Sequence, residues 1–558
     1  MSETDVVVVG AGAGGLAAAW RLTTRGMRVT LLEAGRRYRP ERDYPQTSAD
    51  FELRSFPFDP VSDERGKPRH GFGPAQEIEA SWDSYRSHDL VTGRQTGNRR
   101  LYIQYAHVRG VGGSTLHFQG EAHRYHPDSL RMASLLGAGV DWPISPPELE
   151  RYYELAERRM GVAAPAESRF RPRSNPPPFP AHRLSYASAR LSKAFSAVGL
   201  TLVPNSLAIL SDAFEGRPPC NYCNSCTEGC PIGDKGSADV TFLPEALRTG
   251  RLELRTESPA TQIEVDGKGR ASGVVFADRE GTLQRIQARF VVLAGSAIET
   301  PRLLLVSTSR FFPLGLANGS GQVGRNLTET LFWQSTALLP ERVDSYRGVP
   351  VDGIAWDESV PRVRRSGAVG GFRLSTAHGE SELRGPAAYA KRLVPGFGLE
   401  HQKRMADVFG RAVGILGMGD WLQNAGTLVD LDPGLTDAHG LPVARITSRL
   451  EENERRLLRE MVDRGRALLS AAGASILEEF SSLDRFLATH VLGTCRMGKS
   501  PVDSVSDPDG FSHEVPNLAF ADGSLVPSSG SGDSPSLTIT ALALRTADRL
   551  LDRAGRGG

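Results

Sequence analysis

Four cysteines follow one another at short intervals in the middle of the chain. Cys220, Cys223, Cys226 and Cys230 are separated by two, two and three residues, and Pro231 follows the last of them. This is the spacing with which thiolates wrap a cuboidal iron–sulfur cluster. Because the chain has only one further cysteine, the run predicts a single [4Fe–4S] centre, or a [3Fe–4S] centre with three ligands. Zinc, usually held by two separated pairs, and disulfides, which a reducing cytosol disfavours, are the competing interpretations.

A second group of chemically informative residues stands near the N-terminus. Gly10, Gly12 and Gly15 form a GxGxxG pattern between four consecutive valines and an Ala/Leu-rich segment, and Gly14 lies within it. Such glycines allow a tight turn, let the backbone approach a pyrophosphate and let a helix lie close to a strand. Glu33 ends the next apolar run, about twenty residues on, where an acid can accept hydrogen bonds from ribose hydroxyls. The stretch predicts an adenine dinucleotide site, with NAD and FAD both open.

The elements that position these residues follow from apolar runs and from helix start and stop signals. The valines at 6–9 predict a central parallel strand, followed by a helix at 16–24 and a second strand at 28–32. Ser145-Pro-Pro-Glu148 is a capping box with proline at the first helical position, and it predicts a helix that ends at Met160. Further predicted elements are helices at 187–198 and 536–553 and strands at 101–108, 252–255, 260–265 and 290–295.

Four separated segments resemble the glucose–methanol–choline (GMC) family of FAD oxidoreductases. They are the glycine fingerprint, Gly110-Val-Gly-Gly-Ser-Thr, Gly324-Arg-Asn-Leu327, and a C-terminal block that contains HVLGTCRMG from His490, NLAFADG and SPSLT. The resemblance implies an α/β fold, in which a Rossmann-like FAD-binding domain is joined to a discontinuous substrate domain with an antiparallel sheet. It also selects FAD as the cofactor.

The resemblance extends the expected flavin site beyond the fingerprint. The glycines after residue 110 leave room for backbone beside the isoalloxazine ring, and the C-terminal block supplies contacts to the pyrophosphate and the pyrimidine side. His117 stands where some relatives attach the flavin covalently, and the alternative is a histidine packed beside the ring without a bond. The expected cofactor-binding residues are Gly10, Gly12, Gly14, Gly15, Glu33, Gly112, Gly113, Ser114, His117, Ala260, Asp522, Gly523 and Thr538.

The same resemblance implies the chemistry. The family oxidises CH–OH to C=O by hydride transfer to flavin N5 while a base removes the hydroxyl proton. The base would be His490, because an imidazole titrates near neutral pH. Relatives carry His or Asn at the position held here by Ser534, whose shorter side chain leaves the orientation of the alcohol open. Asp533 is expected to offer a longer polar arm beside it.

The cysteine run also resembles that of flavoprotein sugar dehydrogenases, where a cluster relays electrons onward, and a vestigial segment is the alternative. The implied activity is an FAD-dependent dehydrogenase for an alcohol group of a sugar, polyol or glycoside. Its electrons would pass through the cluster to an external acceptor, with an acceptor protein or small subunit as partner. An oxidase that uses O₂, a non-redox lyase-like flavoprotein and an electron-transfer module without its own substrate remain the alternatives.

Composition narrows the class of partner. The 66 basic and 65 acidic residues nearly cancel, which argues against a nucleic-acid or anionic-membrane partner. No apolar run reaches the about 18 residues of a spanning helix, so no membrane span is expected. No signal-peptide pattern precedes the first strand, so a cytoplasmic location is expected, with export as the passenger of a partner left open.

The length of 558 residues predicts two or three domains. FAD-binding parts are expected at 1–165 and, with the cysteine segment, at 220–326. Residues 166–219 are expected to form a linker and a segment of the substrate domain, and residues 327–480 its main part, mainly antiparallel strands with helices. The last part, 481–558, is expected to complete the FAD-binding and catalytic region.

Overall fold

The computed structural model describes residues 4–44, 76–77, 80–81, 106–378, 383, 385–448, 450–482 and 490–556. Its first large unit is a seven-stranded sheet with the order β10-β11-β12-β1-β2-β9, in which β22 also pairs with β12. Strand β1 runs parallel to both β12 and β2. The strands are β1 (Thr4–Val9), β2 (Val29–Leu32), β9 (Leu252–Arg255), β10 (Ala260–Val265), β11 (Ala271–Ala277), β12 (Leu283–Leu293) and β22 (Leu518–Phe520).

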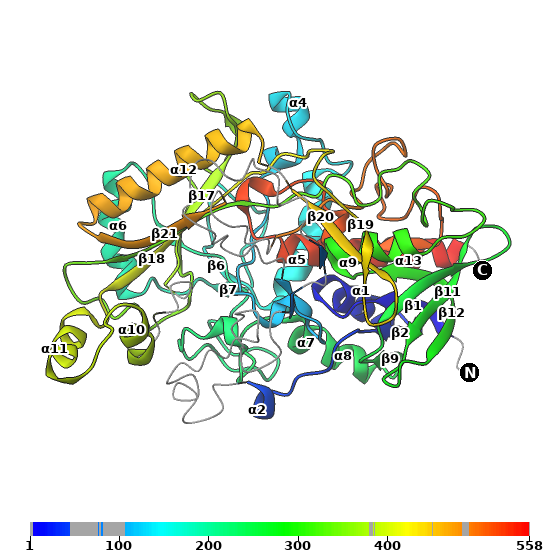
Figure 1. Cartoon of the computed structure of the whole chain (residues 1–558), viewed down its shortest axis with the longest axis horizontal. Helices are drawn as coiled ribbons and strands as arrows, with labels where there is room; N and C mark the ends of the chain where they lie inside the picture. The colour runs from blue at the N-terminus through cyan, green and yellow to red at the C-terminus, as the bar shows by residue number, and fades with distance from the viewer. Residues whose placement is uncertain are drawn as a thin grey trace.

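Helices cover this sheet because its central strand is apolar on both faces. Residues 6–9 of β1 are all buried, as is typical of a strand between two helical layers. Helix α1 (Ala13–Thr24) packs on α13 (Ser536–Arg556), and α13 in turn packs on α5 (Pro146–Met160). In Figure 1 these helices lie with the sheet in one half of the molecule, so the first and last helices of the chain are neighbours.

The second large unit is a six-stranded sheet with the order β21-β13-β18-β17-β14-β8. Every neighbouring pair in it is antiparallel. Helix α12 (Glu452–Ala471) packs on β13 and β18, where Gly465 lets the Trp333 ring approach the helix backbone. The strands are β8 (Val203–Pro204), β13 (Leu331–Leu338), β14 (Gly353–Ala355), β17 (Phe372–Thr376), β18 (Ala412–Gly419) and β21 (Ser475–Ser481).

Smaller elements join and decorate the two sheets. Strands β19 (Leu428–Thr436) and β20 (Pro442–Thr447) form a hairpin that packs on α9 (Ser296–Val306). The other elements are the short strands β3 (Gln76–Glu77), β4 (Ala80–Ser81), β5 (Ala106–His107), β6 (Ala163–Ala164), β7 (Phe179–Pro180), β15 (Arg362–Val363) and β16 (Val369–Gly370), and the helices α2 (Pro40–Asp43), α4 (Met132–Leu136), α6 (Tyr186–Ala197), α7 (Ala238–Thr241), α8 (Leu243–Arg248), α10 (Pro386–Arg392) and α11 (Gly398–Val408).

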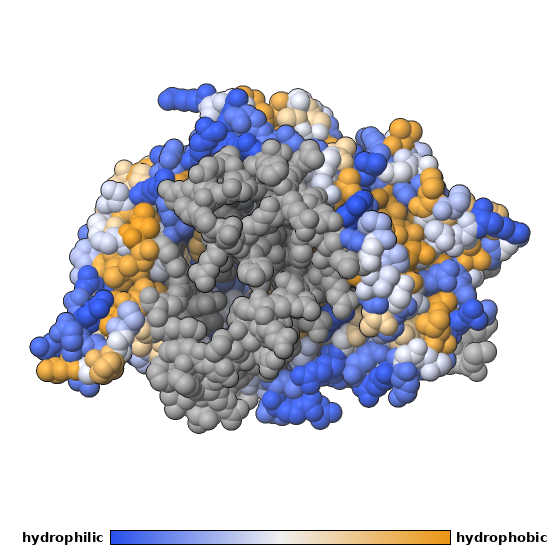
Figure 2. Space-filling view, in the orientation of Figure 1, coloured by the Kyte–Doolittle hydropathy of each residue, from blue (hydrophilic) through white to orange (hydrophobic). Residues whose placement is uncertain are grey.

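The surface is mixed in polarity. Hydrophilic residues gather over α2 at the lower edge of the view in Figure 2, in agreement with its sequence PERD. The α10–α11 region, at the left of Figure 1, exposes Phe397 and Leu399. No helix in the described part of the chain is long and apolar enough to cross a membrane.

The predicted α/β architecture with a Rossmann-like unit and an antiparallel substrate sheet is confirmed. The helices predicted from residues 16, 149, 187 and 536 are present as α1, α5, α6 and α13, and the predicted strand at 290–295 is the end of the longer strand β12. Most of the predicted strand at 101–108 lies outside the described residues. The domain boundaries remain a prediction.

Candidate functional site

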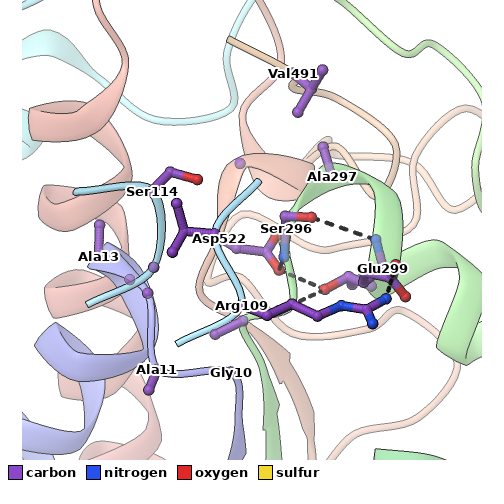
Figure 3. Close-up of a pocket in the computed structure, with 18 of the residues that line it drawn as sticks. Gly10, Ala11, Ala13, Arg109, Ser114, Ser296, Ala297, Glu299, Val491 and Asp522 are labelled. Carbon is purple, nitrogen blue, oxygen red and sulfur yellow. Dashed lines mark hydrogen bonds and ion pairs between the residues drawn. The ribbon is translucent and has the colours of Figure 1, made fainter. Parts of the chain in front are cut away.

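A cavity of about 680 Å³ lies between the two sheets. Its wall is built from the β1–α1 turn, the end of β2, the loop at 113–119, the start of α9, strands β13 and β18, and the segments 490–491, 522–523 and 534–536. Figure 3 shows how segments far apart in sequence come together there: Ala13, Ser114, Ser296 and Asp522 belong to four separate stretches of the chain, and Asp522 points toward Ser296. The lining therefore gathers motif segments from both ends of the chain.

The glycine end of the cavity has the shape needed to hold a phosphate. Gly12 is the N-cap of α1 and no side chain caps that helix, so its first N–H groups are available to an anion. A Cβ added at Gly12 would meet no atom within 4 Å, which places open cavity space beside it. At Gly14 a Cβ would stand 1.6 Å from the Ala521 carbonyl oxygen, so only glycine lets α1 approach that segment.

Glu33 stands beside the glycine turn on the same wall and is buried. Its Oε2 accepts a hydrogen bond from the Ala11 N–H at 2.8 Å, and its Oε1 accepts from the Gly35 N–H at 2.8 Å. Burial raises the pKa of Glu33, and the backbone donors oppose that shift. A carboxylate has about four acceptor positions, so these backbone donors orient the group and leave it able to accept a hydrogen bond from a ribose.

Asp522 ties the end of β22 to the start of α9. Its Oδ2 accepts from the Ser296 N–H at 2.9 Å and from the Thr300 hydroxyl at 2.5 Å. Burial raises the pKa of Asp522. Beside it, Arg109 approaches Glu299 with 3.9 Å between Nη2 and Oε1, as Figure 3 shows. These contacts join the start of α9 to the end of β22 and to the residue 109 loop at the cavity wall.

The imidazole of His490 reaches the cavity from the segment that precedes the GTC motif. A bridge between Thr328 and Leu492 sets its position, because the two backbones exchange hydrogen bonds of 2.9 and 2.8 Å. The hydroxyl of Thr330, two residues after Thr328, lies 3.2 Å from His490 Nδ1. Burial and the nearby Arg373 charge lower the pKa of His490 to about 4, so the ring is neutral at physiological pH.

Ser534 lines the cavity next to a buried ion pair. Its hydroxyl donates to Glu121 Oε2 at 2.6 Å, and Arg373 Nη2 donates to the same carboxylate oxygen at 2.6 Å. Arg373 Nη2 also lies 3.3 Å from Ser534 Oγ. Burial alone would raise the pKa of Glu121, but the Arg373 charge and the hydrogen bonds of the carboxylate lower it to about 2. The carboxylate is therefore ionised.

The backbone around Ser534 is fixed from two sides. The Ser534 N–H donates to His123 Nδ1 at 3.1 Å, so His123 is protonated on Nε2, which donates to Asn205 at 2.9 Å. Burial lowers the pKa of His123 to about 3. On the other side, Gly532 has a positive φ of 81° and packs against the Met418 carbonyl of β18, where a Cβ would not fit.

Asp533 does not reach the cavity. Both of its carboxylate oxygens accept from Arg171 Nη2, at 2.9 and 2.8 Å, and the side chain is fully buried. Burial raises the pKa of Asp533 to about 6. The Asp533 side chain, which was predicted to lie beside the substrate, instead forms an internal ion pair with Arg171.

The other predicted cofactor residues divide into two groups. Most line the cavity, whereas Gly15, Gly112 and Thr538 lie behind its wall. The Thr538 hydroxyl is 2.8 Å from that of Tyr153, and the Gly112 N–H donates to the Ala11 carbonyl at 2.8 Å. The predicted residues on the wall are Gly10, Gly12, Gly14, Glu33, Gly113, Ser114, His117, Ala260, Asp522, Gly523, His490 and Ser534.

His117 contacts the cysteine segment across the cavity edge. Its Nδ1 lies 2.6 Å from the Thr227 carbonyl oxygen. A carbonyl only accepts, so Nδ1 carries the proton. Thr227 also lines the cavity, which places the cysteine segment beside the predicted flavin position.

The four predicted cluster ligands are not arranged as a ligand set. In the part of the chain that the structure describes, no three His, Cys, Asp or Glu side chains are placed so that they could hold a metal ion. Cys223 is exposed and Cys226 is buried, while the Cys230 thiol donates to Asp234 at 2.8 Å. Burial raises the pKa of Cys230 to about 11, and metals bind the thiolate. This arrangement does not support the predicted iron–sulfur centre.

Several residues of the site were not predicted from the sequence. Glu121 and Arg373 stand beside Ser534, while Phe332, Leu416 and Met418 form an apolar wall. Glu121 belongs to GEAHR, a short segment with three ionisable residues directly after the glycine loop, and that density of charge is a usable signal. The strand residues carry no motif.

Comparison with known proteins identifies the class. Models of the family described as GMC oxidoreductase match residues 204–331 and 426–543, and a model of an NAD(P)-binding Rossmann-like domain matches residues 8–46. A 2-methyl-1,2-propanediol dehydrogenase of Mycolicibacterium austroafricanum is 30% identical, with 99% of this chain and 96% of the relative aligned. The chain belongs to the GMC oxidoreductase family and is an oxidoreductase. This membership makes FAD its cofactor.

Other relatives and structures agree. The fructose dehydrogenase large subunit of Gluconobacter japonicus is 29% identical over 100% of this chain and 99% of the relative. Paromamine 6'-oxidase of Streptomyces fradiae is 30% identical over 97% of this chain and 90% of the relative. The crystal structure of pyridoxine 4-oxidase from Mesorbium loti superposes with a TM-score of 0.64 at 18% identity, covering 99% of both chains. That last likeness concerns the fold.

Proposed function

We propose that the protein oxidises a CH–OH group of a sugar, polyol, glycoside or other alcohol to a carbonyl. The observation that carries this proposal is the common cavity, which brings His490 and Ser534 to the same space as the glycine turn and Glu33. Three relatives carry names of the same kind of reaction, a propanediol dehydrogenase, a fructose dehydrogenase and a paromamine oxidase.

FAD fits the residues of the long wall. The ribose would be held by Glu33, the pyrophosphate by the open N-terminus of α1 at Gly12, and the flavin half by Ser114, Asp522 and Gly523. When bound, FAD would accept the hydride of the substrate carbon. The contacts with Ser296 and Thr300 of α9 fix the orientation of the Asp522 carboxylate.

In the proposed reaction His490 takes the hydroxyl proton. The ring is neutral, and the Thr330 hydroxyl lies 3.2 Å from Nδ1. The proposed reaction uses the tautomer whose Nδ1–H donates to that hydroxyl, in which Nε2 accepts the substrate proton. Ser534 orients the alcohol from the same wall, and Glu121 and Arg373 support it. The apolar residues Phe332, Leu416 and Met418 exclude water from the reacting carbon.

An anaerobic substrate screen tests the proposal. Purified FAD-loaded protein is mixed with sugars, glycosides, polyols and aliphatic alcohols in argon while the flavin absorbance is followed. Bleaching by one of these classes is expected. Bleaching by dithionite but by no CH–OH compound would contradict the proposal and favour the lyase-like or electron-transfer alternatives.

The electron acceptor is a separate question within the same proposal. Relatives are named both as dehydrogenases and as oxidases. Turnover with a dye in argon, compared with hydrogen peroxide yield in air, separates the two activities. We propose the dehydrogenase, with an acceptor protein or small subunit as partner, because one relative is named as the large subunit of its enzyme.

The iron–sulfur relay is the second candidate route for the electrons. The close spacing of Cys220, Cys223, Cys226 and Cys230 favours it, and the placement of their side chains does not. Iron and acid-labile sulfide in anaerobically purified protein decide the matter. About three or four iron atoms per FAD would establish a cluster, whereas iron near zero would exclude it.

The covalent link at His117 is likewise a proposal from the family resemblance, and unbonded packing is its alternative. His117 lines the cavity and carries its proton on Nδ1. Acid denaturation followed by centrifugation tests the bond. Yellow colour that stays with the pellet supports it, and complete release into the supernatant rules it out.

A further inference from the structure

The hydrogen-bonding direction of Ser534 is fixed by its neighbours. Glu121 is ionised and has no proton to give, so the 2.6 Å contact uses the Ser534 proton. Arg373 has only N–H donors, so toward Ser534 Oγ, 3.3 Å away, it can only donate, and its Nη2 is shared with Glu121 and Met418. Because the Ser534 proton is engaged by Glu121, the hydroxyl offers a molecule in the cavity only lone pairs. Ser534 is therefore an acceptor toward the substrate.

His490 is the second acceptor at this place, as the proposed function requires. Thr330 contacts His490 just before β13, and Phe332 of that strand pairs with Met418. Arg373 Nη2 lies 3.1 Å from Met418 Sδ and 3.3 Å from Ser534 Oγ, so His490 and Ser534 flank the same part of the cavity. A reacting hydroxyl has one proton. If His490 receives that proton, Ser534 needs a different donor.

We propose that the substrate carries a second hydroxyl beside the oxidised CH–OH, and that Glu121 positions Ser534 to accept its proton. The substrate class is thus a vicinal diol. This inference rests on the proposed function and adds the adjacent donor to it. Here Ser534 contacts substrate, and Glu121 is a positioning residue that acts through it.

The surroundings make the loss of the second donor costly. Phe332, Leu416 and Met418 line the cavity nearby, and their side chains carry no hydrogen-bond donor that could replace the second hydroxyl. Ser534 is 4% exposed, so water has little access to its free lone pair when a substrate fills the cavity. A buried group left without a hydrogen bond disfavours the analogue that fails to supply it.

The test compares matched alcohols on the FAD-loaded enzyme in anaerobic stopped-flow experiments. The panel is 1,2-butanediol, 1,4-butanediol and 1-butanol, with trans-1,2-cyclohexanediol and cyclohexanol for a secondary alcohol. The 1,2-diols are expected to reduce the flavin at least about 100-fold more efficiently than the partner compounds, since sites that bind a substrate hydroxyl reject analogues that lack it.

Two variants test whether Ser534 and Glu121 cause the preference for 1,2-diols over mono-alcohols. Ser534→Ala and Glu121→Gln are expected to bring the ratio of diol to mono-alcohol reduction rates below about 5-fold, because the contact to the second hydroxyl is lost whatever happens to the overall rate. Ser528→Ala is the matched control. It makes the same change in the same loop, but Ser528 bonds Trp142 and does not line the cavity, so the preference should persist.

The outcomes separate the two levels of the proposal. Equal reduction by 1-butanol and 1,2-butanediol in wild type overturns the vicinal-diol inference and leaves the proposed function standing. A diol preference that survives Ser534→Ala also overturns it. Bleaching by no alcohol or sugar at all contradicts the proposed function and this inference together. FAD content and melting temperature, measured for each variant, identify any that fail to fold.

Discussion

At the scale of single residues, the site depends on a histidine whose surroundings keep it neutral. Burial and Arg373 both disfavour the imidazolium, and Thr330 holds the ring. Replacing His490 by Asn keeps a polar side chain but removes a titratable base. The rate of anaerobic flavin reduction by substrate is expected to fall by roughly 10²–10⁴-fold, the usual contribution of general-base catalysis.

The control for that variant is its FAD content. His490→Asn should bind FAD and be bleached by dithionite as wild type is, because the residues that would hold the ribose and pyrophosphate lie elsewhere on the wall. A variant that keeps wild-type reduction rates would contradict the role given to His490.

The loss of activity at low pH is expected to follow the protonation of His490. A base must be unprotonated, and the pKa of His490 is lowered to about 4. The value of kcat/KM should therefore be constant from about pH 5 upward and fall as the pH drops through about 4, whereas an unperturbed histidine would give a limb near 6.5. The measurement is kcat/KM against pH, with activity recovered on return to pH 7 as the stability control. A limb near 6.5 would contradict this assignment.

The sequence could supply the residues that sit in motifs and missed those that act through long-range contacts. Gly12, Glu33 and His490 belong to local patterns and line the cavity. Arg373 and Glu121 are 252 residues apart, and Glu121 and Ser534 are 413 apart. No local pattern encodes such pairs. For the same reason the sequence could not show that Asp533 pairs with Arg171, because only the fold brings these two residues together.

At the scale of elements, the β1–α1 turn separates packing from ligand binding. A Cβ at Gly14 would collide with the Ala521 carbonyl oxygen, whereas a Cβ at Gly12 would enter open cavity space. Gly14→Ala should lower the free energy of unfolding by about 1–3 kcal/mol or more, because backbone must shift. Gly12→Ala should leave the stability of the apo-protein unchanged and weaken FAD binding by about tenfold, or about 1.4 kcal/mol.

Chemical denaturation and FAD titration of the two variants check this distinction. Equal loss of apo-protein stability in both variants would contradict it. Gly12 has a φ of −80°, which alanine also adopts, so backbone strain does not confuse the comparison.

Elements with strong local signals were predicted from the residues, and the architecture from the family resemblance, whereas the order of strands within each sheet was not predicted. The apolar run of β1, the capping box of α5 and the periodicity of α13 are properties of short segments. The order of the six-stranded sheet depends on pairing between strands such as β13 and β21, which are far apart in sequence. Side-chain packing between remote segments, as between Trp333 of β13 and Gly465 of α12, is likewise not displayed by one sequence.

At the scale of the whole molecule, the cavity is built from both sheets and completed by the C-terminal segments. A ligand that fills it contacts all of these parts, so FAD binding should stabilise the fold as a unit. Free FAD at about 100 times its dissociation constant should add about 2.7 kcal/mol to the free energy of unfolding. Thermal melts of apo-protein across an FAD series measure this. A melting temperature independent of FAD would contradict the placement of the cofactor in this cavity.

The most direct test of the central claim is a single-turnover balance. Wild-type protein is reduced in argon by the best compound from the screen, and both the bleached flavin and the carbonyl product are quantified. The account predicts one carbonyl formed for each flavin reduced, and no product from protein stripped of FAD. Bleaching without carbonyl, or carbonyl formation without bleaching, would contradict the oxidation of CH–OH in this cavity.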